Sequence, residues 1–147
     1  MVEGATVLVV DDEANLRKTL LAVLQRSGYQ AIPADNAREA LEQLNKKRVD
    51  LIILDLQLPD LDGLSLMKEV VVLFPKIPIL IFTGNGSLNS IEEATRLGAR
   101  GYLLKPADPN TITRRVAKIL KQTNLKERQS KVLDDMDNLL NSLNDFY

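Results

Sequence analysis

The feature that most constrains the fold of this chain is a fivefold alternation of short apolar runs with segments of helical periodicity. The apolar runs fall at residues 6–10, 29–34, 51–54, 79–82 and 101–104, and the helical segments at 14–26, 36–47, 64–73, 90–97 and 109–122. The first, third and fourth runs are apolar at successive positions, which is typical of strands buried on both faces. Repeated strand–helix units favour a parallel sheet with right-handed crossovers. We therefore predict a doubly wound α/β fold with five parallel strands.

Local signals place the ends of several elements. Pro33 cannot donate a ladder hydrogen bond, so the second strand is expected at a sheet edge. Asn36 followed by Glu39 predicts a capping box at the start of the second helix. Gly28 and Gly98 are typical of helix ends. The helical segments are short, which favours one open sheet over an eightfold barrel.

Polar residues follow the apolar runs where four of the predicted strands end. Asp11 and Asp12 follow the first strand, Asp55 the third, Thr83 the fourth and Lys105 the fifth. Because the carboxyl ends of parallel strands meet at one edge, we expect these side chains to converge in one crevice. Helix capping would explain Asp11 or Asp12 taken singly, but it does not explain four strand ends together.

The composition limits the chemistry available to this crevice. The chain has no histidine and no cysteine, which excludes disulfides, cysteine-rich zinc sites, Ser-His-Asp triads and a phosphohistidine donor. Three clustered carboxylates need a counter-charge, and Mg²⁺ suits them because it prefers oxygen ligands. Asp55 is then the candidate nucleophile for a phosphoryl group. Lys105 would neutralise phosphoryl charge, and the Thr83 hydroxyl would donate a hydrogen bond to it.

Charge and hydropathy exclude other roles for this chain. The net charge is −1, which gives no electrostatic basis for direct nucleic acid binding. No apolar run approaches the length that spans a bilayer, and the first residues lack the pattern of a signal peptide. We therefore expect a cytoplasmic location with no membrane association.

The placement of these residues resembles the receiver domain of bacterial two-component response regulators, of the chemotaxis-regulator type. The motifs that carry the resemblance are Asp11-Asp12-Glu13, Asp55 with Pro59 and Gly63, Thr83-Gly84 and Lys105-Pro106. The resemblance covers roughly residues 5–122 and implies a flavodoxin-like strand order of 2-1-3-4-5. It implies phosphorelay signalling, in which Asp55 accepts a phosphoryl group from a sensor histidine kinase or phosphotransfer protein. Such a chain is not an enzyme beyond assisting its own phosphotransfer and dephosphorylation.

The resemblance also implies roles for individual residues. Asp11, Asp12 and Asp55 would hold Mg²⁺ together with the backbone carbonyl of Gln57, Asp12 more directly and Asp11 partly through water. Lys105 would pair with the acyl phosphate, and its bond to the following proline is expected to be cis.

Thr83 and Tyr102 would form a switch pair that changes the surface seen by an output partner or domain. Tyr102 is also compatible with a plain half-buried strand aromatic. Gln57 and Asn85 would flank the water that hydrolyses the acyl phosphate. Asp60 and Asp62 are expected to be solvated loop residues.

Two other functional classes share parts of this pattern. Phosphatases and mutases of the haloacid-dehalogenase type also form an aspartyl phosphate, but they carry a second aspartate where this chain has Gln57. A pseudo-receiver that serves only as a protein-binding scaffold is the other alternative. Uptake of a labile phosphoryl group separates an active receiver from a scaffold, and continuous turnover identifies a phosphatase.

The remaining residues, 123–147, exceed what the predicted domain of residues 1–122 needs. Leu125, Val132, Leu139 and Phe146 recur every seven residues, and Gln129, Met136 and Leu143 fill the intervening heptad position. This seam predicts a helical extension that is coiled-coil-like or a linker, and that supports a homodimer or leads to an output module. A helix packed on its own domain and a solvated tail are the alternatives.

Overall fold

The computed structural model describes residues 4–84 and 86–145, and within these ranges five strands alternate with five helices. The strands are β1 (Thr6–Val10), β2 (Gln30–Ala34), β3 (Leu51–Leu54), β4 (Ile79–Thr83) and β5 (Gly101–Leu104). The helices are α1 (Ala14–Arg26), α2 (Ala37–Lys46), α3 (Gly63–Leu73), α4 (Leu88–Leu97) and α5 (Pro109–Asn144). All strands pair in parallel in the order β2-β1-β3-β4-β5, which confirms the predicted doubly wound fold.

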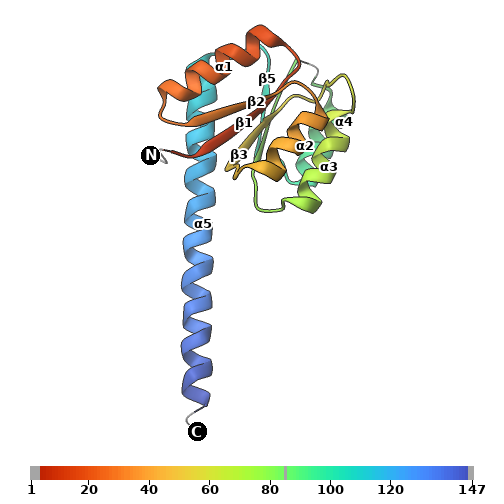
Figure 1. The fold of residues 1–147 in the computed structure, drawn as a ribbon. Helices are drawn as coiled ribbons and strands as arrows, with labels where there is room; N and C mark the ends of the chain where they lie inside the picture. The colour runs from red at the N-terminus through yellow and green to blue at the C-terminus, as the bar shows by residue number, and fades with distance from the viewer. Residues whose placement is uncertain (1–3, 85, 146–147) are drawn as a thin grey trace.

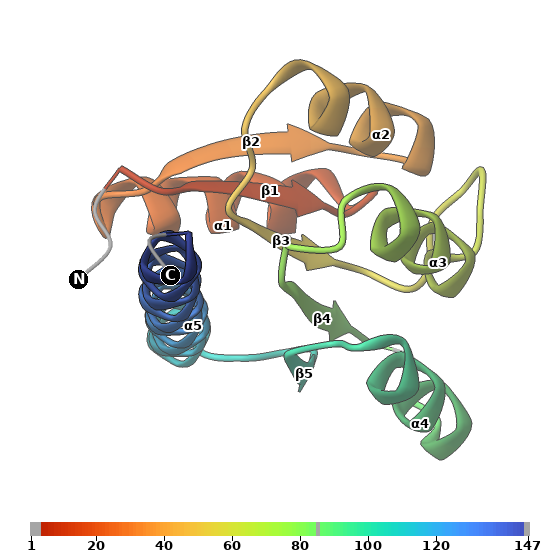
Figure 2. The same ribbon diagram turned by 90° about the horizontal axis from the view of Figure 1, so that it is seen from below.

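Helices cover both faces of the sheet, so the core has two halves (Figures 1 and 2). On one face α1 and α5 pack over a cluster that includes Val9, Phe82 and Val116. On the other face α2, α3 and α4 pack over a cluster that includes Leu8 and Met67. Successive residues of β1, β3 and β4 therefore face opposite halves of the core. This arrangement explains why these strands are apolar without alternation.

The predicted element ends are largely confirmed. Pro33 lies in the edge strand β2, and Gly28 and Gly98 adopt left-handed φ values of 92° and 103° after α1 and α4. The Asn36 side chain accepts a hydrogen bond from the backbone N–H of Glu39 at 2.8 Å. The Glu39 carboxylate, however, accepts from the backbone of the residue before Asn36, so the reciprocal half of the predicted capping box is displaced by one residue.

Helix α5 differs most from the sequence prediction. The helix expected to end near residue 122 continues without interruption to Asn144 and leaves the globular part as a rod (Figure 1). No glycine or proline follows Pro109 to interrupt it, so nothing in the local sequence ends the helix at the edge of the domain. Leu120 is its last buried side chain. The division into units 1–122 and 123–147 stays a prediction. Among the described helices, none has the length and apolarity needed to cross a membrane.

The loop after β3 makes a contact with α2 that the sequence did not indicate. Asp60 is exposed, as expected, but its carboxylate accepts hydrogen bonds from the backbone N–H groups of Ala37 and Arg38 at 2.9 and 3.0 Å. These N–H groups belong to the first turn of α2, which has no partners for them within the helix. The bond from Ala37, and then that from Arg38, lowers the pKa of Asp60. Asp60 therefore caps α2 from outside the helix.

Replacing Asp60 by alanine is expected to lower the free energy of unfolding at neutral pH by about 1 kcal/mol, as for other lost helix caps. Since the folded-state pKa lies below the ordinary value of 3.8, the carboxylate contributes this stability above that pH and loses it as the pH falls through the folded-state value. Urea titrations at pH 7 and below pH 4 should show that the variant and wild type differ less in free energy of unfolding at acid pH. Asp62→Ala is the matched control, because Asp62 makes no capping hydrogen bond with its side chain.

Candidate functional site

The carboxyl ends of three strands fix the backbone of the candidate site. The backbone N–H groups of Asp11, Asp55 and Lys105 each donate to a carbonyl on the neighbouring strand, at 3.0, 3.0 and 2.9 Å. The sheet ladder thus extends one residue beyond β1, β3 and β5. The three functional side chains start from rigid backbone at one edge of the sheet, as predicted.

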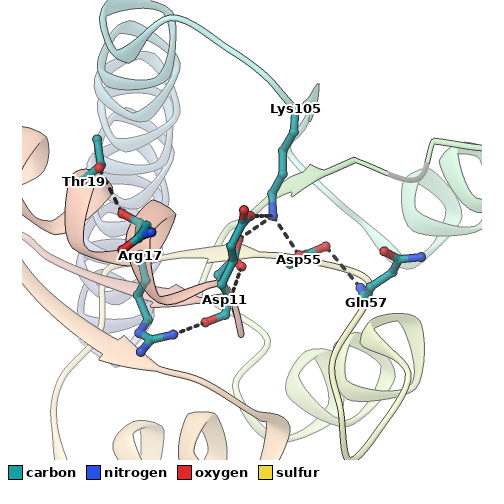
Figure 3. Close-up of polar contacts among 8 residues, drawn as sticks. Asp11, Arg17, Thr19, Asp55, Gln57 and Lys105 are labelled. Atoms are coloured by element: carbon teal, nitrogen blue, oxygen red, sulfur yellow. Dashed lines mark hydrogen bonds and ion pairs between the residues drawn. The ribbon is translucent and has the colours of Figure 1, made fainter.

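Lys105 joins the two buried acids of the site (Figure 3). Its Nζ lies 2.7 Å from Asp11 Oδ2 and 2.9 Å from Asp55 Oδ2, with Glu13 Oε2 further away at 3.7 Å. Asp11 and Asp55 are only 2% and 4% exposed. The bond from Lys105 to Pro106 is cis, as the resemblance implied.

Backbone N–H groups hold the second oxygen of each buried acid. Asp11 Oδ1 accepts from the backbone of Glu13 at 2.9 Å, and Asp55 Oδ1 accepts from the backbone of Gln57 at 3.1 Å. Both carboxylates are therefore fixed at both oxygens while their outer lone pairs stay available.

Burial and pairing act on the protonation of the site in opposite directions. Burial raises the pKa of Asp11, although hydrogen bonds from Lys105 and the backbone of Glu13 partly offset this. Burial lowers the pKa of Lys105, but its hydrogen bonds to Asp11 and Asp55 outweigh this, so that its pKa is raised. Lys105 is therefore charged at neutral pH, and one ammonium serves two buried carboxyl groups.

A pocket of about 360 Å³ opens beside this network. It is lined by Asp12, Glu13, Asp55, Gln57, Gly84 and Lys105. Asp12 is exposed, in contrast to its neighbour Asp11, and brings a third carboxylate to the pocket. Carboxylate oxygens of Asp11, Asp12 and Asp55 lie within 4.8 Å of one another. Asp12 thus lies on the solvent side of the pocket, whereas Asp11 is buried beside it.

The three acids fit a divalent cation. Hard oxygen donors at this spacing are the ligands that Mg²⁺ prefers, and the ion keeps several waters, which suits a pocket open on one side. Two buried acids against one lysine also leave negative charge that a cation would balance. The carbonyl of Gln57 stays a predicted ligand, in a residue that lines the same pocket.

Thr83 and Tyr102 lie on the adjacent strands β4 and β5, Thr83 at the carboxyl end and Tyr102 two residues before it. Thr83 ends β4 and is fully buried, whereas Tyr102 in β5 is half-buried and packs against the α2–α3–α4 half of the core. The Tyr102 hydroxyl is buried and has no hydrogen-bond partner among the described residues. Their switch role stays a prediction. Asn85, expected beside the hydrolytic water, lies outside the described residues.

Two residues, Arg17 and Phe82, support the site without having been predicted to do so. Arg17 in α1 donates from Nη1 to the backbone carbonyl of Asp11 at 2.7 Å (Figure 3). The Lys105 ammonium lies 5.8 Å from the centre of the Phe82 ring, within the range of a cation–π contact. Arg17 follows Glu13 by one helical turn, which is the only sequence signal for its contact.

Gly63 lets α3 begin directly against the loop that carries Asp55. A Cβ atom at this position would lie 2.4 Å from the Cα of Leu56 and 2.7 Å from the carbonyl oxygen of Asp55. Both neighbours are backbone atoms, so they cannot move away as a flexible side chain would. Any side chain at position 63 would clash with this backbone, which explains why the motif has a glycine there.

Comparison with known proteins agrees with this geometry. Residues 7–117 match the family described as the response regulator receiver domain. The sporulation initiation phosphotransferase F of Bacillus subtilis is 37% identical over 114 residues, which cover 78% of this chain and 92% of that protein. Chemotaxis protein CheY4 of Vibrio cholerae has a similar structure, with a TM-score of 0.74, 34% identity, and coverage of 78% of this chain and 98% of that one.

Longer relatives match over the same region. The transcriptional regulatory protein ZraR of Escherichia coli O157:H7 is 35% identical over 128 residues, which cover 87% of this chain. This chain spans only 29% of the length of that relative. The matched family, the sheet order and the cluster of acids all agree. The chain belongs to the receiver domain family of two-component response regulators, which are phosphorelay signalling domains.

Proposed function

We propose that Asp55 is the phosphoryl acceptor of this receiver domain. The observation that carries the proposal is the bridge from Lys105 Nζ to the carboxylates of Asp11 and Asp55, beside an open pocket. Asp55 is the one acid of the three that combines burial with a place in the lining of that pocket. Its carboxylate is fixed before any substrate binds.

The residues around Asp55 have separate tasks in the transfer. An oxygen of Asp55 attacks phosphorus, an acyl-phosphate P–O bond forms, and the bond from phosphorus to the donor breaks. The Lys105 ammonium pairs with the Asp55 carboxylate before the transfer and is placed to pair with the phosphoryl oxygens after it. The backbone N–H of Gln57 keeps the carboxylate oriented throughout. Positioning and neutralisation of this kind supply most of the catalysis of phosphoryl transfer.

Asp11 and Asp12 would hold Mg²⁺ together with Asp55 and the carbonyl of Gln57. When bound, the ion supplies charge neutralisation to the phosphoryl oxygens. The exposure of Asp12 supports a direct contact with the ion, and the engagement of Asp11 with Lys105 supports contact partly through water. Arg17 positions Asp11 through its carbonyl.

Thr83 and Tyr102 would pass the phosphorylation state to the surface. The Thr83 hydroxyl would bond the phosphoryl group, and Tyr102 would repack on the side of α4. The buried and unpartnered hydroxyl of Tyr102 supports this role, because a buried polar group without a partner costs free energy that a new arrangement can recover. The donor would be a sensor histidine kinase or phosphotransfer protein, and the receiver of the signal an output partner or domain.

Incubation with acetyl phosphate and Mg²⁺ tests the proposal. Intact mass spectrometry should show one added phosphoryl group that is lost on standing, and none when EDTA replaces Mg²⁺. Asp12→Asn should raise the Mg²⁺ concentration needed for half-maximal uptake by about tenfold or more, as loss of a metal ligand does. Continuous release of phosphate from excess donor would instead identify a phosphatase, and no uptake would identify a scaffold.

A further inference from the structure

The outer part of α5 exposes an apolar stripe that its own domain does not cover. Leu125, Val132, Met136, Leu139 and Leu143 are each between 54% and 66% exposed. With Gln129 they recur at alternating spacings of three and four residues, which is typical of a coiled-coil seam. Phe146, the last predicted member of the seam, lies outside the described residues. A stripe of this kind on a protruding helix marks an interaction surface.

In the same segment, basic side chains gather in the first half of the helix and acidic side chains in the second half. Residues 121–131 hold four basic side chains and one acidic one, whereas residues 132–145 hold four aspartates and no basic side chain. A parallel second copy would place the basic segment of one helix beside the basic segment of the other, and the aspartates beside the aspartates. An antiparallel second copy would place residues 123–131 of each helix, with three basic side chains, opposite residues 137–145 of the other, which hold Asp137 and Asp145 and no basic side chain. Antiparallel helix dipoles favour the same orientation.

We propose that the outer part of α5 pairs in antiparallel orientation with that of a second copy of this chain. Leu125 would face Leu143 of the second copy, and Val132 would face Met136 of the second copy. The midpoint then falls near residue 134.

The length of the exposed segment fits this register. Each helix would end beside Asn124 of the other copy, close to where the helix leaves its own domain after Leu120. Asp134 and Asp135 would each lie near their own copies at the midpoint, but exposed like charges cost little in water. The pairing does not depend on the phosphoryl chemistry of Asp55.

The molar mass of the full chain tests whether the stripe is a self-association surface. Sedimentation equilibrium should show a concentration-dependent dimer for wild type and a monomer for Val132→Asp/Met136→Asp. The control Ser130→Asp/Asn138→Asp adds the same charge on the other side of the helix. Its dimer dissociation constant should stay at least tenfold lower than that of the seam variant. Circular dichroism melting of the globular part checks that both variants fold. A wild-type monomer at all concentrations would overturn the proposal.

Cysteine cross-linking tests the orientation, since the chain has no native cysteine. Leu125→Cys and Leu143→Cys are prepared separately, one of them with a mass tag, and are oxidised alone and as a mixture. Antiparallel pairing predicts a mixed disulfide in the mixture and little homodisulfide in either variant alone, because two copies of residue 125 would lie about 27 Å apart. Abundant homodisulfide in each separate variant would show parallel pairing and overturn the proposal.

Discussion

Asp55→Asn is expected to abolish phosphoryl uptake from acetyl phosphate in the presence of Mg²⁺. The amide is nearly the same size as the carboxylate, so the packing at this 4% exposed position is retained. It lacks the negative oxygen that attacks phosphorus, and it offers a metal ion a neutral ligand in place of a charged one. Intact mass spectrometry under conditions that fully modify wild type should show no added phosphoryl group.

Asp62→Asn is the matched control for this experiment. Asp62 lies in the loop that follows Asp55, is exposed and makes no capping hydrogen bond with its side chain. Its neutralisation should leave the uptake unchanged. Full uptake by Asp55→Asn would place the acceptor on another carboxylate and would contradict the proposed role of Asp55.

Lys105→Met is expected to give the largest loss of stability among substitutions at the site. The change leaves the carboxylates of Asp11 and Asp55 buried without their shared cation, and removing one partner of a buried ion pair typically costs about 3–5 kcal/mol. Urea unfolding in EDTA should show this loss. Added Mg²⁺ should recover more stability in the variant than in wild type, because the ion replaces the missing positive charge.

An exposed pair and a double variant control for this prediction. Lys68→Met removes the ion pair with Glu93, which is 3.2 Å long but largely exposed, and should cost less than about 1 kcal/mol. Combining Lys105→Met with Asp55→Asn should be less destabilising than the sum of the two changes, since the double variant lacks one of the uncompensated acids. Simple additivity would show that Lys105 and Asp55 do not stabilise each other.

The part of the site that sequence reasoning predicted shares one property. Asp11, Asp55, Thr83 and Lys105 each lie at or just after the end of a strand, so the hydrophobic pattern that defines the strand also places the side chain. A parallel sheet gives all such positions the same edge. The hydrophobic pattern along the sequence was therefore enough to predict that these side chains converge.

The contacts that were missed depend on distances that no local pattern encodes. The hydrogen bond from Arg17 to the Asp11 carbonyl requires α1 to pack at a particular rotation, and the capping of α2 by Asp60 requires a loop 23 residues away to approach it. Asp60 and Asp62 lie two residues apart in the same turn-rich stretch of the sequence. The approach of α2 gives Asp60 a role that Asp62 lacks.

The sequence by itself determined the sheet, its two covered faces and the strand ends that carry the acids and the lysine, because burial and periodicity act on neighbouring residues. The tertiary structure alone decided that Asp11 is buried against Lys105 while Asp12 faces the pocket. It also decided that the predicted helical extension is continuous with α5 and is left uncovered by its own domain. Those outcomes depend on which surfaces the other elements cover, and coverage is a property of the packed chain rather than of any segment.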